Sequence, residues 1–388
     1  GVSPTGSALR VASTLGIPLA ASRLYLHGVS VDQEFRTQFL SRSATSLGLP
    51  DMAYADLPSF YPSGWFWLGG RFANLVGLEG WEAFKPWSIL SLAVAAALVT
   101  VLWMRLLRTD LGAAVGLVST AMMLTYGSPE PYGAVVALFL PPVLLLAWHA
   151  VNPTSRRGGR GAALATLLFL GASASTYTLY TGLAAGTVVF MAVVATVIAL
   201  VRRRSSAPPY PLWLPAARLA LVGIGSLLVA SIVWAPYLLA SLGGAPADSG
   251  TALHYLPDAG ARLPLPMTAG GLTGLVCLAG LVWIVLRARD SRRAQSLGLG
   301  VVAVYLWCLA SMAVTALGTT MLGFRLEPVL IGLLTVAGVF AIADVAALIV
   351  RAAGRQNGTE RPAAEAADRR AFQLRQNRAS RIVLSLLP

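Results

Sequence analysis

A short polar run near the start of the chain holds charged residues whose types and spacing suit acid–base chemistry. Asp32, Glu34 and Arg36 lie in the run Val31-Asp32-Gln33-Glu34-Phe35-Arg36. Residues four apart share a face of a helix, so Asp32 and Arg36 are predicted to be neighbours. A positioned carboxylate can take the proton of a hydroxyl group that does not ionise at neutral pH. Asp32 is therefore a candidate general base.

Each of these residues also has a structural interpretation. Asp32 could cap a helix over residues 33–42 by accepting hydrogen bonds from its first backbone amides. Glu34 faces another side of that helix, where it is either a substrate or metal ligand or a solvated charge. Arg36 either pairs with Asp32, worth ~0–1 kcal/mol at an exposed site, or binds phosphate through its planar guanidinium.

The segment at 28–82 adds further carboxylates and many aromatic rings. Rings stack on the C–H faces of sugars while carboxylates accept hydrogen bonds from sugar hydroxyls, although the same rings also suit a belt at a membrane surface. A rigid turn, Ser128-Pro129-Glu130-Pro131-Tyr132, contributes one more acid, whose structural alternative is the turn itself. The predicted sugar- or acceptor-binding residues are Glu34, Asp51, Tyr54, Tyr61, Trp65, Trp67 and Glu130.

Cations outside this segment supply candidates for binding a phosphate. Lys85 and Arg325 lie at the mouths of apolar runs, and His254 lies in a loop between two such runs. Together with Arg36 they form the predicted donor-phosphate set. The alternatives are side chains that snorkel to the membrane surface and, for His254, a loop hydrogen bond. Three histidines in all give a His-based zinc site no support, and whether a divalent cation takes part stays open.

The composition is that of a polytopic membrane protein. Of the 388 residues, 56% are hydrophobic and 12% are charged, against about 25% charged in soluble domains. The net charge of +13 does not indicate nucleic-acid binding, because the arginines fall between apolar runs. Nine runs have about the 20 residues that a membrane span needs. They are 86–104, 111–127, 132–150, 161–179, 181–201, 215–239, 268–286, 296–317 and 328–350.

These runs divide the chain into four parts. Residues 1–27 are predicted to be a partial span or juxtamembrane segment, 28–82 a large loop, 83–355 a transmembrane core of about nine spans, and 356–388 a tail with the start of a truncated span. The start at Gly1 and the apolar end predict a piece of a longer protein.

Arginine clusters predict the orientation of the spans. They occupy every second connection, and the positive-inside rule places them in the cytoplasm and the 28–82 loop outside. The clusters are Arg105 and Arg108, Arg156 to Arg160, Arg202 to Arg204, Arg287 to Arg293, and Arg351 with Arg355.

Six strings in collinear order carry a resemblance that covers nearly the whole chain. They are VDQEFRTQFLSR, DMAYADLPSFYPSGWFWLGGR, WEAFKPW, SPEPY, HYLP and FRLEP. Together they resemble the actinobacterial galactan 5-O-arabinofuranosyltransferases, the priming enzymes of arabinogalactan synthesis in the glycosyltransferase-C superfamily. The resemblance implies an all-α helix bundle in the plasma membrane, with short helices in the large extracytoplasmic loop and the active site on that face.

The resemblance also implies a reaction. Decaprenyl-phosphoryl-β-D-arabinofuranose would donate the first arabinofuranosyl residues to the 5-hydroxyl of galactofuranose in lipid-linked galactan. A β donor and an α-linked product imply inversion in a single displacement, with Asp32 as the base. Superfamily members often begin this site with two adjacent acids, whereas here Gln33 follows Asp32, so the role of Glu34 and of any metal ion is not decided.

A second class of function is a transporter or flippase of a polyprenyl-phosphate-linked sugar. Such carriers tend to have repeated halves and ionisable residues near the middle of the bilayer. The apolar runs hold few charges, with Arg218 and Asp344 as the main exceptions, both near predicted ends. This distribution favours an enzyme that acts at the outer face.

Overall fold

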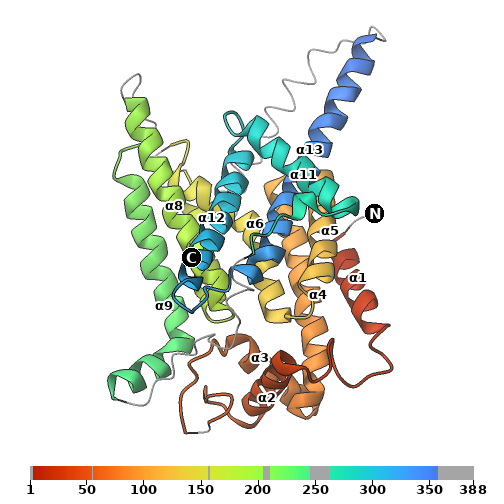
Figure 1. The fold of residues 1–388 in the computed structure, drawn as a ribbon, viewed down its shortest axis with the longest axis vertical. Coiled ribbons are helices and arrows are strands. Elements are labelled where there is room, and N and C mark those ends of the chain that lie inside the picture. Colours follow the sequence, from red (N-terminus) through yellow and green to blue (C-terminus); the bar gives the residue numbers. More distant parts are fainter. Residues whose placement is uncertain (1–2, 55, 156–157, 204–209, 245–261, 357–388) are drawn as a thin grey trace, which may run out of the picture.

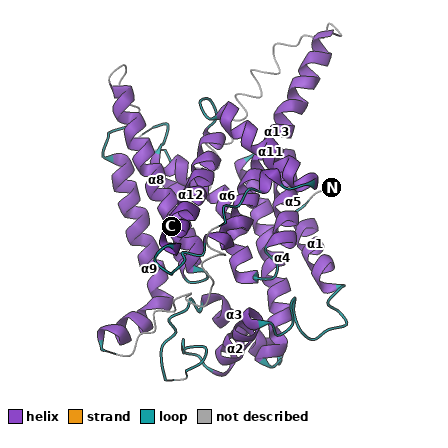
Figure 2. Ribbon diagram, viewed as in Figure 1, coloured by secondary structure: helices purple, strands orange, loops and turns teal. Residues whose placement is uncertain are grey.

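The computed structural model is a bundle of long helices with two shorter helices packed across one end (Figures 1 and 2). The structure describes residues 3–54, 56–155, 158–203, 210–244 and 262–356, and these form helices and loops without a strand. Six of the described helices are long and apolar enough to cross a membrane. The expected all-α, multi-pass membrane architecture is therefore confirmed.

Each of the nine apolar runs corresponds to a helix in the described part of the chain. Their bounds are Gly80–Leu106 (α4), Thr109–Tyr126 (α5), Pro131–Val151 (α6), Arg160–Ala174 (α7), Thr178–Arg203 (α8), Leu214–Leu242 (α9), Gly271–Arg287 (α11), Arg292–Thr315 (α12) and Glu327–Gln356 (α13). The helices α4, α6, α8, α9, α12 and α13 have the length and hydropathy of a span; α7 and α11 are shorter apolar helices.

Helix α6 lies at the centre of the bundle (Figure 1). It packs against α4, α7, α8, α12 and α13, and most of its side chains are buried. Pro131 occupies its first position, where the missing N–H costs no helical hydrogen bond. The residue before it, Glu130, is therefore held at the end of the most enclosed helix.

Residues 1–27, predicted to be a partial span or juxtamembrane segment, contain a helix. Helix α1 runs Pro4–Gly16, and the chain then turns through residues 17–29. The Ser3 hydroxyl caps α1 by accepting a hydrogen bond from the Gly6 amide at 3.0 Å. Helix α1 packs along α4.

Helices α2 (Val31–Thr45) and α3 (Gly64–Val76) form the cap across the end of the bundle. Helix α2 begins earlier and ends later than the expected helix at 33–42, and its N-cap residue is Ser30. Asp32 therefore lies in the first turn and is not the cap, which corrects that alternative. Its negative charge is still favourable there, close to the positive end of the helix dipole.

Close backbone contacts fix α2 in place. A side chain at Gly70 in α3 would collide with the Ser43 backbone, and one at Gly80 with Ser41. The Arg71 guanidinium donates to the carbonyls of Ser43, in the last turn of α2, and of Ser46, its C-cap residue, where carbonyl groups lack helical partners. The cap is thus held against the bundle at the C-terminal half of α2.

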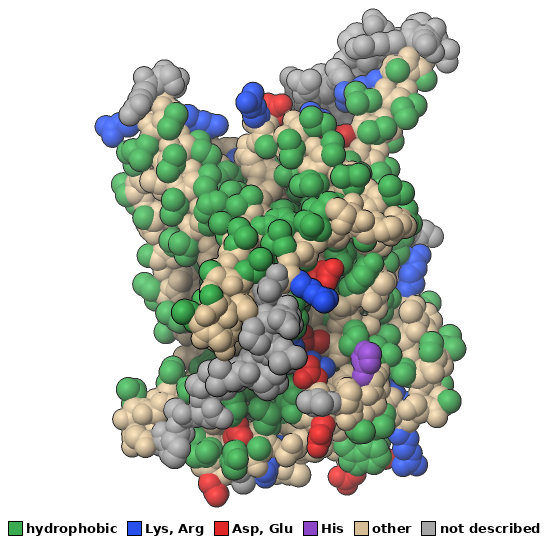
Figure 3. All heavy atoms as spheres, in the orientation of Figure 1, with side chains coloured by type: hydrophobic (Ala, Val, Ile, Leu, Met, Phe, Trp, Pro, Cys, Tyr) green, Lys and Arg blue, Asp and Glu red, His purple; other side chains and the backbone are tan. Residues whose placement is uncertain are grey.

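Acidic side chains gather toward one end of the bundle. Figure 3 shows basic side chains at the top, where α8 ends and α12 begins, and most of the acidic side chains, with further basic ones among them, in the lower half, around α2 and α3. The basic connections after α8 and before α12 thus lie at the same end of the bundle.

The contact between α11 and α13 gives a test of the packing. A Cβ added at Gly280 in α11 would collide with the Leu334 carbonyl of α13, so Gly280→Ala should lower the free energy of unfolding by ~1–3 kcal/mol. Gly332 in α13 has no atom within 4 Å of such a Cβ, so Gly332→Ala should be neutral or stabilising by up to ~1 kcal/mol. Thermal unfolding of the detergent-solubilised variants measures both, and equal melting temperatures would contradict this packing.

Candidate active site

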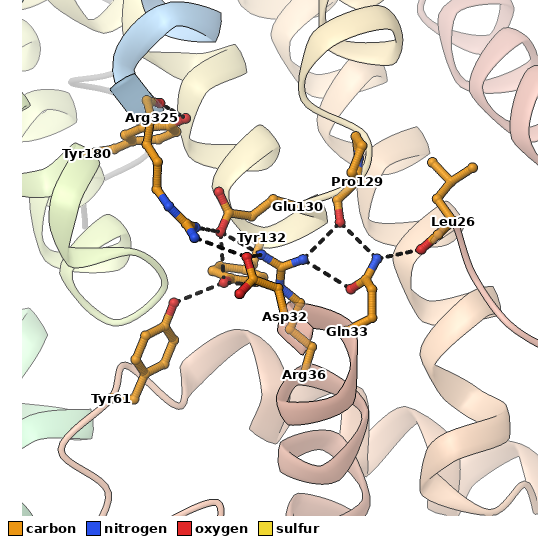
Figure 4. A network of polar contacts seen from close by, with 10 residues as sticks. All are labelled: Leu26, Asp32, Gln33, Arg36, Tyr61, Pro129, Glu130, Tyr132, Tyr180 and Arg325. Carbon is orange, nitrogen blue, oxygen red and sulfur yellow. Dashed lines mark hydrogen bonds and ion pairs between the residues drawn. The ribbon is translucent and has the colours of Figure 1, made fainter. Parts of the chain in front are cut away.

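Four charged residues from three separate parts of the chain form an alternating cluster (Figure 4). Arg325 donates to Asp32 at 3.0 Å and to Glu130 at 2.9 Å. Arg36 donates to the same two carboxylates, at 3.5 Å and 2.9 Å. Each carboxylate thus faces both guanidinium groups, and the four formal charges sum to zero.

The elements that carry these residues explain why they meet. Asp32 and Arg36 lie in the first half of α2, Glu130 precedes α6, and Arg325 lies in the short 3₁₀ helix η2 (Gly323–Leu326) that leads into α13. The N-termini of three helices therefore converge on the cluster. Their unpaired amides and dipoles favour negative charge at this point.

Arg36 is the most enclosed of the four, with 5% of its side chain exposed. Besides the two carboxylates, it donates through Nε to the Tyr132 hydroxyl at 3.3 Å and through Nη1 to Gln33 Oε1 at 3.1 Å and the Pro129 carbonyl at 3.3 Å. These contacts employ all five N–H groups of a guanidinium. Every N–H group of the Arg36 guanidinium is therefore bonded to another group of the protein.

Electrostatics keep Arg36 ionised in this enclosed position. Burial by itself would lower its pKa, but the interactions with Tyr132 and Glu130, followed by that with Asp32, outweigh burial and raise the pKa above its ordinary value.

Two tyrosines extend the cluster in a defined direction. The Tyr132 hydroxyl donates to Glu130 Oε1 at 3.0 Å, so its oxygen accepts at 2.9 Å from Tyr61. Burial, and then the negative charge of Glu130, raises the pKa of Tyr61 above its ordinary value, which keeps its proton in place. The Tyr61 hydroxyl thus helps to orient the Tyr132 hydroxyl that donates to Glu130.

Each carboxylate accepts these hydrogen bonds through one of its two oxygens. Asp32 Oδ2 receives both arginines, and Glu130 Oε1 receives both arginines and Tyr132. Asp32 has 38% of its side chain exposed, against 18% for Glu130 and 17% for Arg325. Asp32 is therefore the member of the cluster most open to a reactant.

A cavity of about 460 Å³ opens beside the cluster. Its charged and polar lining includes Asp32, Gln33, Arg36, Glu130 and Arg325, with Glu327 at the start of α13. Further along α6 and α13 the lining becomes apolar, with Ala134, Ala137, Pro328 and Ile331, and Phe324 joins them from η2. The cavity therefore offers a charged part and an apolar part to one ligand.

Some of the expected phosphate ligands lie elsewhere. The Lys85 ammonium donates to the carbonyls of Leu19 and Ser22, which ties the start of α4 to the turn after α1, and Lys85 does not line the cavity. His254 lies outside the described residues. Of the four predicted cations, the structure brings Arg36 and Arg325 to the carboxylates.

The expected sugar-binding residues divide in the same way. Tyr61 and Glu130 belong to the cluster, whereas Glu34 is exposed on the far side of α2 and Tyr54 lies in the surface loop. Asp51 is buried and accepts hydrogen bonds from the amides of Ala53 and Tyr54, which shapes the loop.

The two tryptophans have structural contacts. Trp65 is buried among Phe84, Trp87 and Tyr132, so no ring face is open to a sugar. Trp67 donates to the Leu47 carbonyl and stacks under the Arg71 guanidinium.

The sequence analysis did not single out several residues of the cluster and cavity, among them Tyr132, Gln33 and His27. Tyr132 and Gln33 join the charged groups, and His27 lines the cavity with an unusual positive φ of 66°. The signal for Gln33 was present in the spacing: Gln33, Arg36, Leu40 and Ser43 recur at helical intervals and form the buried face of α2.

Among the described residues, no group of three or more histidine, cysteine, aspartate or glutamate side chains is placed to hold a metal ion. The two acids of the cluster instead face guanidinium groups.

The fold and the cluster together define a multi-pass helical membrane protein with a charged site at one end of its bundle. Residues 2–368 match the family described as "Arabinofuranosyltransferase N terminal", and the chain belongs to that family.

Curated relatives share this sequence over most of the chain. The galactan 5-O-arabinofuranosyltransferase of Mycolicibacterium smegmatis is 49% identical over 331 residues, 85% of this chain and 51% of that protein. The protein of that name from Corynebacterium glutamicum is 46% identical, covering 86% of this chain and 48% of its own length. The one from Mycobacterium tuberculosis is 45% identical, with coverages of 85% and 50%. The chain thus spans about half the length of these relatives.

Among solved structures, the archaeal oligosaccharyltransferase AglB from Archaeoglobus fulgidus, in complex with an inhibitory peptide and a dolichol-phosphate, aligns with 98% of this chain and 54% of its own. The TM-score is 0.38 and the identity 11%.

The cluster predicts that loss of its enclosed acid Glu130 lowers stability more than loss of an exposed acid. Glu130→Ala removes a partner from Arg36, an enclosed cation, and should lower the free energy of unfolding by ~3 kcal/mol. The matched control is Asp110→Ala, which breaks an ion pair with Arg108 whose side chains are 68% and 62% exposed and should cost ~0–1 kcal/mol. Thermal unfolding compares the two, and a similar loss in both would show that the cluster contributes no more than a surface pair.

Proposed function

We propose that the protein to which this chain belongs transfers the first arabinofuranosyl residues from decaprenyl-phosphoryl-β-D-arabinofuranose to the 5-hydroxyl of galactofuranose in cell-wall galactan. The observation that carries the proposal is the Asp32–Arg36–Glu130–Arg325 cluster opening into a cavity with an apolar part. The family and the names of its curated relatives supply the sugar and the acceptor.

The lining of the cavity suits a donor that has a polar part and a lipid part. A polyprenyl-phosphoryl sugar carries an anionic phosphate beside a long apolar chain, and the lining changes from charged to apolar along α6 and α13. The phosphate would lie at the three helix N-termini, where negative charge is favoured. The first isoprene units would follow Ala134, Ala137 and Ile331 into the bundle.

Asp32 is the proposed general base. Its Oδ2 receives the two guanidinium contacts, while Oδ1 makes no hydrogen bond within the described part of the chain. An acceptor hydroxyl in the cavity would give its proton to Oδ1 as its oxygen attacks the anomeric carbon of the donor. The bond from that carbon to the phosphate oxygen breaks in the same step, so the configuration inverts and the lipid phosphate leaves.

Arg325 is the proposed ligand of the departing phosphate. A planar guanidinium matches the geometry of phosphate oxygens and stabilises the charge that develops on them. Arg36 is less suited to this role, because a phosphate would have to displace one of its five contacts. Arg36 instead fixes the relative positions of Asp32 and Glu130.

The position of the cluster favours an enzyme over a carrier. Its charged residues lie at the starts of α2, α6 and α13, at the end of the bundle opposite the arginine-rich connections. Carriers place such groups near the middle of the bilayer. We therefore propose an active site on the extracytoplasmic face of the plasma membrane, with lipid-linked galactan as the partner that approaches from outside.

The base assignment predicts the effect of a conservative change. Asp32→Asn keeps the shape of the side chain but removes its basicity, so kcat should fall by about 10²–10⁴ while the donor KM changes less. The assay is transfer of labelled arabinose from the decaprenyl-phosphoryl donor to a short galactofuranan by the full-length protein. A rate within a few-fold of the wild type would remove Asp32 from the role of base.

The phosphate assignment predicts a change in one Michaelis constant. Arg325→Ala should raise the donor KM about tenfold or more, since a hydrogen bond to a charged group contributes ~1.5–3 kcal/mol, and should leave the acceptor KM within a few-fold. Lys85→Ala is the matched control, because Lys85 bonds backbone carbonyls away from the cavity. An unchanged donor KM in Arg325→Ala would place the phosphate elsewhere.

A further inference from the structure

Gln33 is a deeply buried polar residue next to the cluster, with 1% of its surface exposed. Its side-chain amide donates to the Leu26 carbonyl at 2.7 Å and to the Pro129 carbonyl at 3.1 Å, while its oxygen accepts from Arg36 at 3.1 Å. Both N–H groups of the amide and one lone pair of its oxygen are therefore in use. Figure 4 shows Gln33 between Leu26, Pro129 and Arg36.

These contacts close a small ring of hydrogen bonds. Arg36 Nη1 donates to Gln33 and also to the Pro129 carbonyl, which accepts in turn from Gln33. The ring employs both N–H groups of Nη1. It thereby leaves Nη2 directed at Asp32 and Glu130, so the orientation of the guanidinium depends on Gln33.

The same contacts hold the turn that carries Glu130. Three consecutive residues of this turn receive hydrogen bonds from the segment 25–36. Tyr25 donates to the Ser128 carbonyl at 2.8 Å, Gln33 and Arg36 to the Pro129 carbonyl, and Arg36 to the Glu130 carboxylate. Gln33 therefore contacts both the guanidinium and the backbone that present the two ends of one ion pair.

The glutamine amide satisfies this position through two donors and one acceptor. A methionine of similar length would leave the buried carbonyls of Leu26 and Pro129 without these donors, and buried unsatisfied carbonyls are unfavourable. A glutamate would set a negative charge against the same two carbonyl oxygens and compete with Asp32 and Glu130 for Arg36. The residue that separates Asp32 from Glu34 in the sequence is thus distinguished by its two donors.

We infer that Gln33 is a positioning residue of the active site, which aligns Arg36 and the Ser128–Glu130 turn so that Asp32 and Glu130 meet Arg325 in one arrangement. The effect on catalysis rests on the proposed transferase function. Gln33 lines the cavity but its polar atoms are occupied by the protein, so it acts on the reaction through Arg36 and the turn.

The test combines a structural and a kinetic readout on the full-length protein. The variants are Gln33→Met and Gln33→Glu, with Ser41→Ala as the matched control, because Ser41 also bonds a backbone carbonyl in α2 but does not reach the turn. Amide hydrogen exchange at Gly127 and Glu130, whose N–H groups donate to the Met123 and Gly127 carbonyls, should be about tenfold faster in both Gln33 variants, as expected for loss of one or two hydrogen bonds, and unchanged in Ser41→Ala.

The kinetic readout separates positioning from general stability. In both Gln33 variants kcat should fall about tenfold or more while the donor KM changes less, since misalignment acts mainly on the transition state. Gln33→Met added to Glu130→Gln should cost less than it does alone, because the two residues act through the same turn. Fully additive losses would overturn the positioning role.

The exchange result decides the inference even if the transfer assay fails. Unchanged exchange at the turn in Gln33→Met would overturn it, and so would faster exchange spread equally over α2 and α3, which would indicate general loosening. If the wild type did not transfer arabinose while the turn still loosened selectively, the proposed function would be wrong and the structural role of Gln33 would stand.

Discussion

The arrangement of the site depends on one buried guanidinium. Arg36 is nearly inaccessible to solvent, yet it remains charged because two carboxylates, a hydroxyl, an amide oxygen and a carbonyl accept all five of its N–H groups. A buried charge without such partners would be strongly unfavourable. The contacts of Arg36 therefore constrain α2, the turn before α6 and, through the shared carboxylates, η2 to one geometry.

Charge neutrality makes this geometry compatible with a membrane-facing site. Two acids and two arginines alternate, so the cluster can lie at the mouths of apolar helices without a net formal charge. An anionic ligand that reached Arg325 would have to compete with Asp32 and Glu130. Its arrival would weaken the hold of Arg325 on Asp32, which couples phosphate binding to the state of the proposed base.

The two arginines of the cluster differ in their surroundings. Arg36 is enclosed by α2, α6 and Tyr132, and has a structural role that no lysine could fill, since an ammonium group has three N–H groups and no planar fork. Arg325 approaches the carboxylates from η2 at the edge of the cavity. One cation thus fixes the cluster, and the other is the proposed ligand of the phosphate.

The sequence by itself determined the helices and the first pair of the site. Long apolar runs must satisfy their backbone groups internally, so each of the nine runs became a helix, and the four-residue spacing brought Asp32 beside Arg36. The tertiary structure alone decided that Glu130 and Arg325 complete the cluster, that Lys85 does not line the cavity and that Trp65 is buried. Glu130 lies 94 residues from Arg36, and Arg325 lies 293 residues from Asp32. Periodicity reports only neighbours along one helix, whereas these contacts arise where the turn before α6 and the 3₁₀ helix η2 meet the start of α2.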